Sequence, residues 1–207
     1  MNSKKIKLLL IILLLISTLI SCLHPVYPQQ MLLQHSATML VLVFLTVDLF
    51  KSYLGVTSFI CVTLFTLMHI IGARWIYSYV PYQQWFQRLF GGEISGFIES
   101  GRNHYDRFVH FMYGFLLYIP VREFYQRRYK VILSLASQLS LLIIMSSSLV
   151  YELFEWSLTI LLSSGDADAY NGQQGDMWDA QKDIALATLG GLIMAVLLWV
   201  KVHFRKV

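Results

Sequence analysis

The sequence predicts an all-α fold, a six-span transmembrane helical bundle with both termini cytoplasmic. Hydrophobic residues make up 57% of the 207 residues, and charged residues only 14%. Soluble domains carry about a quarter charged residues, so a water-soluble fold would lack polar surface. The apolar residues also come in long blocks, and lysine and arginine gather at the ends of those blocks. We therefore expect one polytopic domain, residues 1–207, in a lipid bilayer.

A helix needs about 20 residues to cross about 30 Å of hydrocarbon. The fourth and sixth apolar blocks reach a useful length only if the polar turns around Asp106 and Asp183 are helical. The fifth can continue to Leu162. The loop 74–105 contains "YQQWFQRLFGG", which is typical of an amphipathic helix in the membrane interface. The six expected spans are residues 6–23, 31–50, 53–73, 106–121, 131–155 and 183–200.

Basic residues predict the orientation of the bundle. Lysine and arginine precede the first span, follow the sixth, and lie between the second and third and between the fourth and fifth. With six spans these places share one side, which the positive-inside rule makes the cytoplasm. Arg74, Arg88 and Arg102 are exceptions on the other side. Asp48 and Glu123 have basic neighbours and are expected to be ordinary cytoplasmic-side charges. This distribution argues for membrane orientation and against a nucleic-acid partner, and protein partners are not indicated.

The N-terminal segment has two interpretations. Lysines, an apolar run and then Leu19-Ile20-Ser21-Cys22 resemble a lipoprotein signal that ends at a lipidated cysteine. The alternative is an ordinary first span in which Cys22 is a small apolar residue. The other cysteine, Cys61, lies inside an apolar block, so no disulfide framework is expected.

Polar residues in or near spans are costly and are therefore candidates for function. In the predicted topology the acidic and imidazole groups of four spans lie at one level, the outer interface. Asp106 and His110 are four residues apart, as are Asp179 and Asp183, so each pair shares a helix face. Glu152 and Glu155 are three residues apart. The predicted site is thus built from helix ends that are distant in sequence.

Imidazole nitrogens and carboxylate oxygens together suit a divalent metal, and the same groups can act as general acids and bases. Arginine binds phosphate well, so Arg102 and Arg107 are expected to hold the phosphate of an anionic lipid or envelope precursor. The candidate metal ligands or catalytic acid–base groups are Asp106, His110, Glu152, Glu155, Asp179 and Asp183, with His69 as a weaker ligand.

Three alternatives remain open at this point, and the metal-dependent site is the first. The aspartates, including Asp176, can cap helices and meet the positive end of the helix dipole, and the arginines can pair with Glu99 and Glu155. In that structural interpretation the cluster only locks helix ends together. The dipole does not explain glutamates near the end of the fifth span, unless that helix continues to Leu162. The third alternative is an ion or small-solute transporter with the acidic cluster as its outer vestibule.

Three motifs, "NHYDRFVHFMYGFLL", "YELFEW" and "GDMWDAQKDIALATLGGL", resemble the YjdF family of bacterial inner-membrane proteins, whose domain has no assigned function. The resemblance covers nearly the whole chain and implies the same membrane fold. A more distant likeness is to VanZ-like proteins, through Asp106, His110, Glu152 and Asp183 with Gly190-Gly191. Arg107 stands where those proteins usually have lysine. The motif residues are Tyr105, Asp106, Arg107, His110, Tyr151, Glu152, Glu155, Trp156, Gly175, Asp176, Trp178, Asp179 and Asp183.

Overall fold

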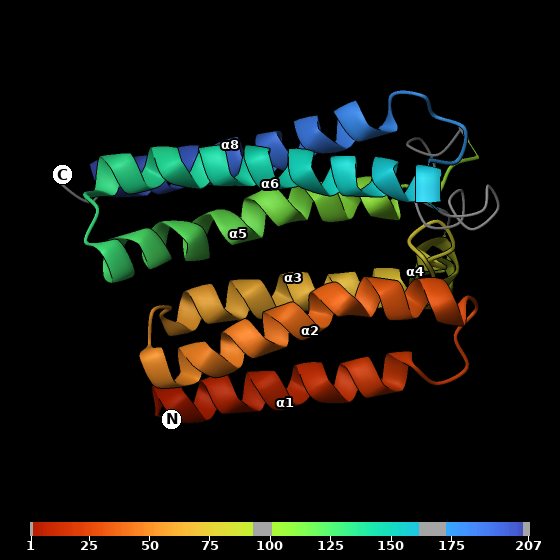
Figure 1. The fold of residues 1–207 in the computed structure, drawn as a ribbon, viewed down its shortest axis with the longest axis horizontal. Helices are drawn as coiled ribbons and strands as arrows, with labels where there is room; N and C mark the ends of the chain where they lie inside the picture. The colour runs from red at the N-terminus through yellow and green to blue at the C-terminus, as the bar shows by residue number, and fades with distance from the viewer. Residues whose placement is uncertain (1, 93–100, 162–172, 205–207) are drawn as a thin grey trace.

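The computed structural model describes residues 2–92, 101–161 and 173–204, and in these ranges the chain folds into seven α-helices without any β-strand (Figure 1). The predicted all-α class is confirmed. The helices are α1 Ser3–Ser21, α2 Pro28–Lys51, α3 Val56–Arg74, α4 Tyr82–Phe90, α5 Tyr105–Tyr129, α6 Leu133–Leu161 and α8 Asp179–Phe204.

Each of the six segments predicted to span the membrane overlaps one of the long helices. Four segments are long and apolar enough to cross a membrane: α2, α3, α6 and residues Asp179–Val202 of α8. The other two, α1 and α5, carry charged residues near their ends. Helix α5 extends beyond its predicted end to Tyr129, and α6 continues to Leu161, so Glu152 and Glu155 lie within the helix and not at its end. The short helix α4 falls on the stretch predicted to be amphipathic.

The long helices form two groups of three (Figure 1). Helices α1, α2 and α3 pack on one another, as do α5, α6 and α8, and the contact between α3 and α5 joins the groups. Helix α1 begins and α8 ends at the same end of the bundle, which we call the terminus end. Helices α5 and α8 both begin at the opposite end, which we call the site end. They therefore run parallel to each other.

Glycines bring α5 and α8 into backbone contact. A Cβ atom on Gly114 would lie 1.8 Å from the carbonyl oxygen of Ala187, and one on Gly190 would lie 2.1 Å from that of Phe111. No side chain fits at either position. Membrane helices associate by such close packing of small residues, because the lipid is as apolar as their surfaces. Because the helices are parallel and in contact here, their first turns lie beside each other at the site end.

A buried ion pair ties α1, α2 and the loop before α3 together at the terminus end. Lys7 Nζ lies 2.6 Å from Asp48 Oδ2 and 2.7 Å from the carbonyl oxygen of Leu54. Asp48 Oδ1 accepts a hydrogen bond from the Leu54 amide at 2.8 Å. The Asp48 side chain is 0% exposed. The expectation of an ordinary cytoplasmic-side charge is therefore wrong for Asp48, because the loop folds back over its carboxylate.

Glu123 also has a structural contact in addition to its basic neighbour. Its Oε2 accepts a hydrogen bond from the Gly55 amide at 2.8 Å, and its Oε1 lies 2.6 Å from Arg127 Nη2. Gly55 precedes the first turn of α3, where backbone amides have no helical partner. Glu123 thus connects α5 to the start of α3.

Arg74 closes the end of α1 at the site end of the bundle. Its Nη1 donates to the carbonyl oxygens of Ser21 at 2.8 Å and Leu23 at 2.7 Å, and more weakly to Ile20 at 3.3 Å. The last carbonyls of a helix have no helical partner and carry partial negative charge. Cys22 and Cys61 do not form a disulfide with each other, and Cys22 is exposed.

Asp48→Ala is expected to lower the free energy of unfolding by about 3–5 kcal/mol, because Lys7 would remain buried without its counter-ion. The double variant Lys7→Met/Asp48→Leu should recover part of this loss, since it removes both charges. Reversible unfolding in mild detergent measures the effect. A single variant as stable as the unsubstituted protein would contradict the buried pair.

Gly190→Ala should destabilise the protein by about 1–3 kcal/mol, because the new methyl group meets the backbone of α5. Gly191→Ala is the matched control. Its nearest neighbours are the flexible side-chain ends of Ile144 and Leu141, each 3.3 Å away. Alanine is the better helix former, so this control should be neutral or slightly stabilising. Equal unfolding midpoints for the two variants would argue against backbone contact at Gly190.

Candidate functional site

The first turns of α5 and α8 and the middle of α6 place acidic and imidazole groups together at the site end. Asp106 and His110 share one face of α5, and Asp179 and Asp183 share the facing side of α8. The Gly114–Ala187 contact lies one turn further along both helices. Glu152 approaches from α6 and is 7% exposed. Parallel helices held this closely leave little room for water between these groups.

Asp106, His110 and Asp183 each offer one ligand atom, and these atoms all lie within 4.8 Å of one another. His110 Nε2 is 3.7 Å from Asp106 Oδ1 and 3.6 Å from Glu152 Oε1. We call these four residues the ligand cluster. The two distances exceed hydrogen-bond length, so His110 Nε2 is not hydrogen-bonded to either carboxylate.

The spacing can be compared with known coordination geometry. Bonds of about 2.0–2.6 Å separate adjacent ligand atoms by about 3–4 Å and opposite ligands by about 4–5 Å. The 4.8 Å spread falls at the upper end of this range. An oxygen-preferring ion fits it with little movement, whereas zinc requires the side chains to close in.

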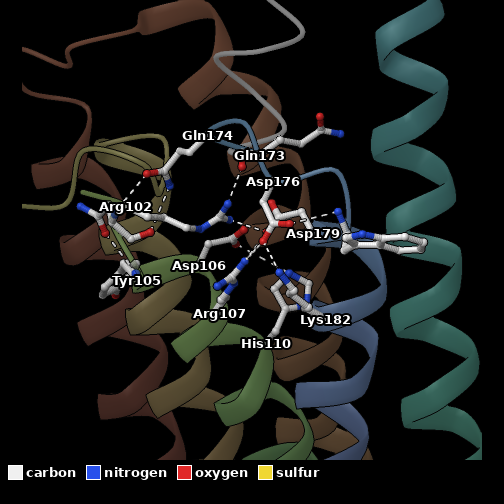
Figure 2. Close-up of polar contacts among 12 residues, drawn as sticks. Arg102, Tyr105, Asp106, Arg107, His110, Gln173, Gln174, Asp176, Asp179 and Lys182 are labelled. Atoms are coloured by element: carbon white, nitrogen blue, oxygen red, sulfur yellow. Dashed lines mark hydrogen bonds and ion pairs between the residues drawn. The ribbon is translucent and has the colours of Figure 1, made fainter. Parts of the chain in front are cut away.

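The two arginines at this end are paired with aspartates of the chain itself (Figure 2). Arg102 forms an ion pair with Asp179 and donates to the carbonyl oxygen of Gln173. Arg107 pairs with Asp176, and its Nη2 lies 3.4 Å from Asp179 Oδ1. The two arginines that were expected to bind phosphate are therefore already paired with carboxylates. Their partners also differ from the alternative pairing with Glu155, while Glu99 lies outside the described residues.

Asp176 is an ion-pair centre as well as a capping residue. Its Oδ2 lies 2.6 Å from Lys182 Nζ, and its Oδ1 accepts a hydrogen bond from the Trp178 amide at 3.1 Å. The hydrogen bond from Lys182 is the main cause that lowers the pKa of Asp176 to about 2. The purely capping role considered from sequence is too narrow, because Asp176 also fixes Arg107 and Lys182 beside α8.

This pairing leaves the carboxylates of the ligand cluster without a basic partner. Among the described residues, no lysine or arginine forms an ion pair with Asp106, Glu152 or Asp183. Glu152 Oε1 and Asp183 Oδ1 are buried and have no hydrogen-bond partner in the described part of the chain. Buried carboxylates of this kind are costly unless a proton or a cation neutralises them. The cluster therefore has the chemistry of a cation or proton site.

Comparison with known proteins gives the family. The model of a family described as predicted membrane proteins, DUF2238, matches residues 6–203. The chain belongs to the DUF2238 family. It is 31% identical to the inner membrane protein YjdF of Escherichia coli strain K12 over 148 residues, which cover 69% of this chain and 64% of that protein. The chain thus spans less than two thirds of the length of this relative. No solved structure matches the chain.

The family match confirms the predicted resemblance to YjdF and a location in the inner membrane. The resemblance to VanZ-like proteins stays a prediction. The names of the family and of this relative specify no reaction, so the geometry of the site is the guide to its chemistry.

His69 does not join the ligand cluster of the DUF2238 chain. Its Nε2 donates to the carbonyl oxygen of Gln34 at 3.0 Å, which leaves Nδ1 to accept from the Tyr77 hydroxyl at 2.5 Å. Both ring nitrogens are therefore used, and neither offers a lone pair to a metal. The sequence placed His69 at the correct depth, but it could not show that α2 and Tyr77 supply partners.

Asp179 and Glu155 lie beside the cluster and not within it. Asp179 is held by Arg102 and Arg107. Glu155 is half-buried and lines a pocket of about 330 Å³ between α6 and the start of α8, together with Glu152 and Asp179. This pocket, which we call the α6–α8 pocket, gives a water-soluble ion a route to Glu152.

A second cavity lies on the other side of the cluster, at the depth of the spans. It has a volume of about 210 Å³ and is lined by residues of α2, α3, α5 and α6, including Asp106 and His110. Sequence reasoning missed some of its remaining polar groups, which look like ordinary residues of apolar helices. The helical spacing Ser148–Glu152 and His110–Tyr113 was the available signal. The missed residues are Tyr77 and Tyr113, whereas Tyr151 was known as a motif residue, and Ser147 and Ser148 as polar residues of the fifth span.

Proposed function

We propose that this DUF2238 protein binds a divalent cation through Asp106, His110 and Asp183, with Glu152 as a fourth ligand or a general base. The observation that carries the proposal is the convergence of Asp106, His110 and Asp183 within 4.8 Å, with Glu152 3.6 Å from His110 and no lysine or arginine partner in the described chain. A divalent cation would neutralise the excess carboxylate charge and satisfy Glu152 Oε1 and Asp183 Oδ1.

The proposed ligand is an anionic membrane lipid or envelope precursor at the outer face. A bound cation attracts a phosphoryl oxygen and polarises it as a Lewis acid. Arg107 retains a role beside the cation, because its buried Nε has no hydrogen-bond partner among the described residues. Arg102 and Asp179 then act mainly by holding the start of α8 against α5. A protein that uses the same cluster only to exchange protons or ions remains the alternative function.

We infer six membrane spans, with the terminus end in the cytoplasm and the site end outside. Helix α1 begins and α8 ends at the same end of the bundle, as an even number of spans requires (Figure 1). Two of the arginines that break the positive-inside rule have structural partners: Arg74 binds the end of α1, and Arg102 binds Asp179. Their side is therefore set by folding contacts and not by topology signals.

We also infer that α1 is retained and that Cys22 is an ordinary residue. Helix α1 packs on α3, and its Lys7 is the buried counter-ion of Asp48. Cleavage before Cys22 would remove Lys7 and leave Asp48 buried and unpaired. The lipoprotein interpretation therefore conflicts with the packing of the first helix.

Labelling of intact cells with a membrane-impermeant maleimide tests the orientation and the fate of Cys22 together. Exposed Cys22 should react from outside. The control Cys22→Ser/Lys130→Cys, with its thiol at the terminus end, should react only after lysis. Labelling of the control in intact cells would contradict the orientation. A shortened chain with an unreactive Cys22 would contradict retention of α1.

Metal analysis of the purified protein tests the cation site. The unsubstituted protein should carry close to one divalent metal per chain, and His110→Ala and Asp183→Asn should lose most of it. His104→Ala, also at the start of α5, and Glu123→Gln, at the far end of the same helix, are matched controls that should keep it. Equal, negligible metal in all five proteins would remove the cation proposal and favour proton exchange or a structural role.

A further inference from the structure

The cavity at span depth lies directly beneath the ligand cluster. Ser148 is one helical turn further into the bundle than Glu152, and Tyr113 is nearly one turn beyond His110. The wall is mostly apolar, with Val41, Phe65 and Val109 among its residues. Asp106 and His110 form part of the same wall, so the cavity and the ligand cluster share side chains. We call this space the lateral cavity.

The lateral cavity lies between the two groups of helices. Helices α3 and α5, which pack on each other, contribute residues to its floor, and α2 and α6 contribute its two sides. In Figure 1, α2 crosses in front of α3 and α6 crosses in front of α8, so both sides flank the same face of the bundle. Ala37 of α2 lines the cavity and is itself exposed on the surface. At this depth that surface faces lipid hydrocarbon.

One polar side chain that lines the lateral cavity has no hydrogen-bond partner among the described residues. Ser148 is 3% exposed, lines the cavity, and its Oγ has no hydrogen-bond partner among the described residues. The neighbouring Tyr113 hydroxyl, by contrast, is bonded to Ser147 Oγ at 2.5 Å. A buried hydroxyl without a partner is costly, so Ser148 is suited to a ligand that brings a polar atom into an apolar space.

We propose that the lateral cavity takes one hydrocarbon chain of a membrane lipid, which enters between α2 and α6. The polar linkage of the lipid lies beside Ser148, and its anionic headgroup lies at the ligand cluster. The headgroup part rests on the proposed cation site, whereas the chain part rests on the cavity alone. An engineered cavity of about 150 Å³ already binds benzene. The 210 Å³ here accommodates the first part of a chain, and the rest remains in the bilayer.

The apolar lining of the lateral cavity determines which part of a lipid the protein can discriminate. Moving a chain from lipid into an apolar cavity gains little, because lipid tails are as apolar as the lining side chains. Discrimination must therefore come from the polar linkage and the headgroup. Ser148 is placed to recognise the linkage, and the ligand cluster is placed to recognise the negative charge. Uncharged lipids should compete weakly for this cavity.

Photo-crosslinking in proteoliposomes tests the proposal. The probe is phosphatidylglycerol with a diazirine near the carboxyl end of one acyl chain, added to the full-length protein. Mass spectrometry should locate the adduct on peptides of α2 and α6 that line the cavity. Ala37→Phe narrows the mouth and should reduce the adduct at least about fivefold. Ser148→Ala removes one hydrogen bond and should reduce it about 2–10-fold.

The control is Ala185→Phe, which adds the same bulk to an exposed position of α8. It should leave the adduct unchanged. Metal content and the unfolding midpoint are measured on every variant, and Ala37→Phe and Ser148→Ala should match the unsubstituted protein in both. Equal labelling of Ala37→Phe and Ala185→Phe would overturn the proposal. A dimer that Ala37→Phe dissociates would also overturn it, because a second chain would then cover the mouth.

The outcomes for the two proposals are separable. A metal-free protein that still gives the cavity adduct, and loses it in Ala37→Phe, supports the lateral cavity and removes the cation site. A protein that binds metal through His110 but gives no adduct on α2 or α6 keeps the cation site and overturns the chain-binding cavity.

Discussion

The backbone contact between α5 and α8 is the constraint on which the rest of the site depends. Gly114 and Gly190 allow two parallel helices to approach until a single added methyl group would meet a carbonyl oxygen. From this contact both helices run toward the site end with the same rise per residue. His110 and Asp183 therefore meet one turn away, and Asp106 and Asp179 a further turn away. These two glycines thus position six ionisable groups, Arg102 and Arg107 included, without any covalent link between the helices.

The charge balance at the site end follows from the same geometry. Two arginines and a lysine form ion pairs with two aspartates at the start of α8. This network fixes the start of α8. Because its basic side chains are paired with Asp176 and Asp179, none of them pairs with the deeper carboxylates. Asp106, Glu152 and Asp183 are left with His110. Evolution toward stability alone would favour apolar residues at these positions, since replacing buried charges by well-packed hydrophobic groups is often neutral or stabilising. Their presence is therefore better explained by binding of a cation or exchange of a proton.

Much of this arrangement could be predicted from the sequence, because hydrophobic blocks and helical spacing are local signals. All six long helices and the depth of Asp106, His110, Glu152 and Asp183 follow from them. Contacts between segments that are distant in sequence do not follow from these local signals. In the sequence Lys7 and Asp48 are two separate charges, and only the fold pairs them. His69 has the spacing of a ligand, but in the fold Gln34 and Tyr77 occupy its nitrogens. Arg102 and Arg107 could be placed at the correct end, but the choice of Asp179 and Asp176 over other acids depends on how the helices pack. Cavities likewise depend on which side chains leave space, and no local pattern contains that information.

The ligand cluster also separates two different environments. On one side Glu152 reaches the α6–α8 pocket, which is acidic and connected to the start of α8. On the other side Asp106 and His110 line the lateral cavity, which is mostly apolar and lies between the two helix groups. A soluble ion and a hydrocarbon chain cannot share one route, because each is unfavourable in the medium that suits the other. Two routes that meet at one set of carboxylates solve this problem for a site that must bind both. The Ser148 hydroxyl has no hydrogen-bond partner among the described residues and lies one turn below Glu152. A ligand in the lateral cavity can form a hydrogen bond with it there.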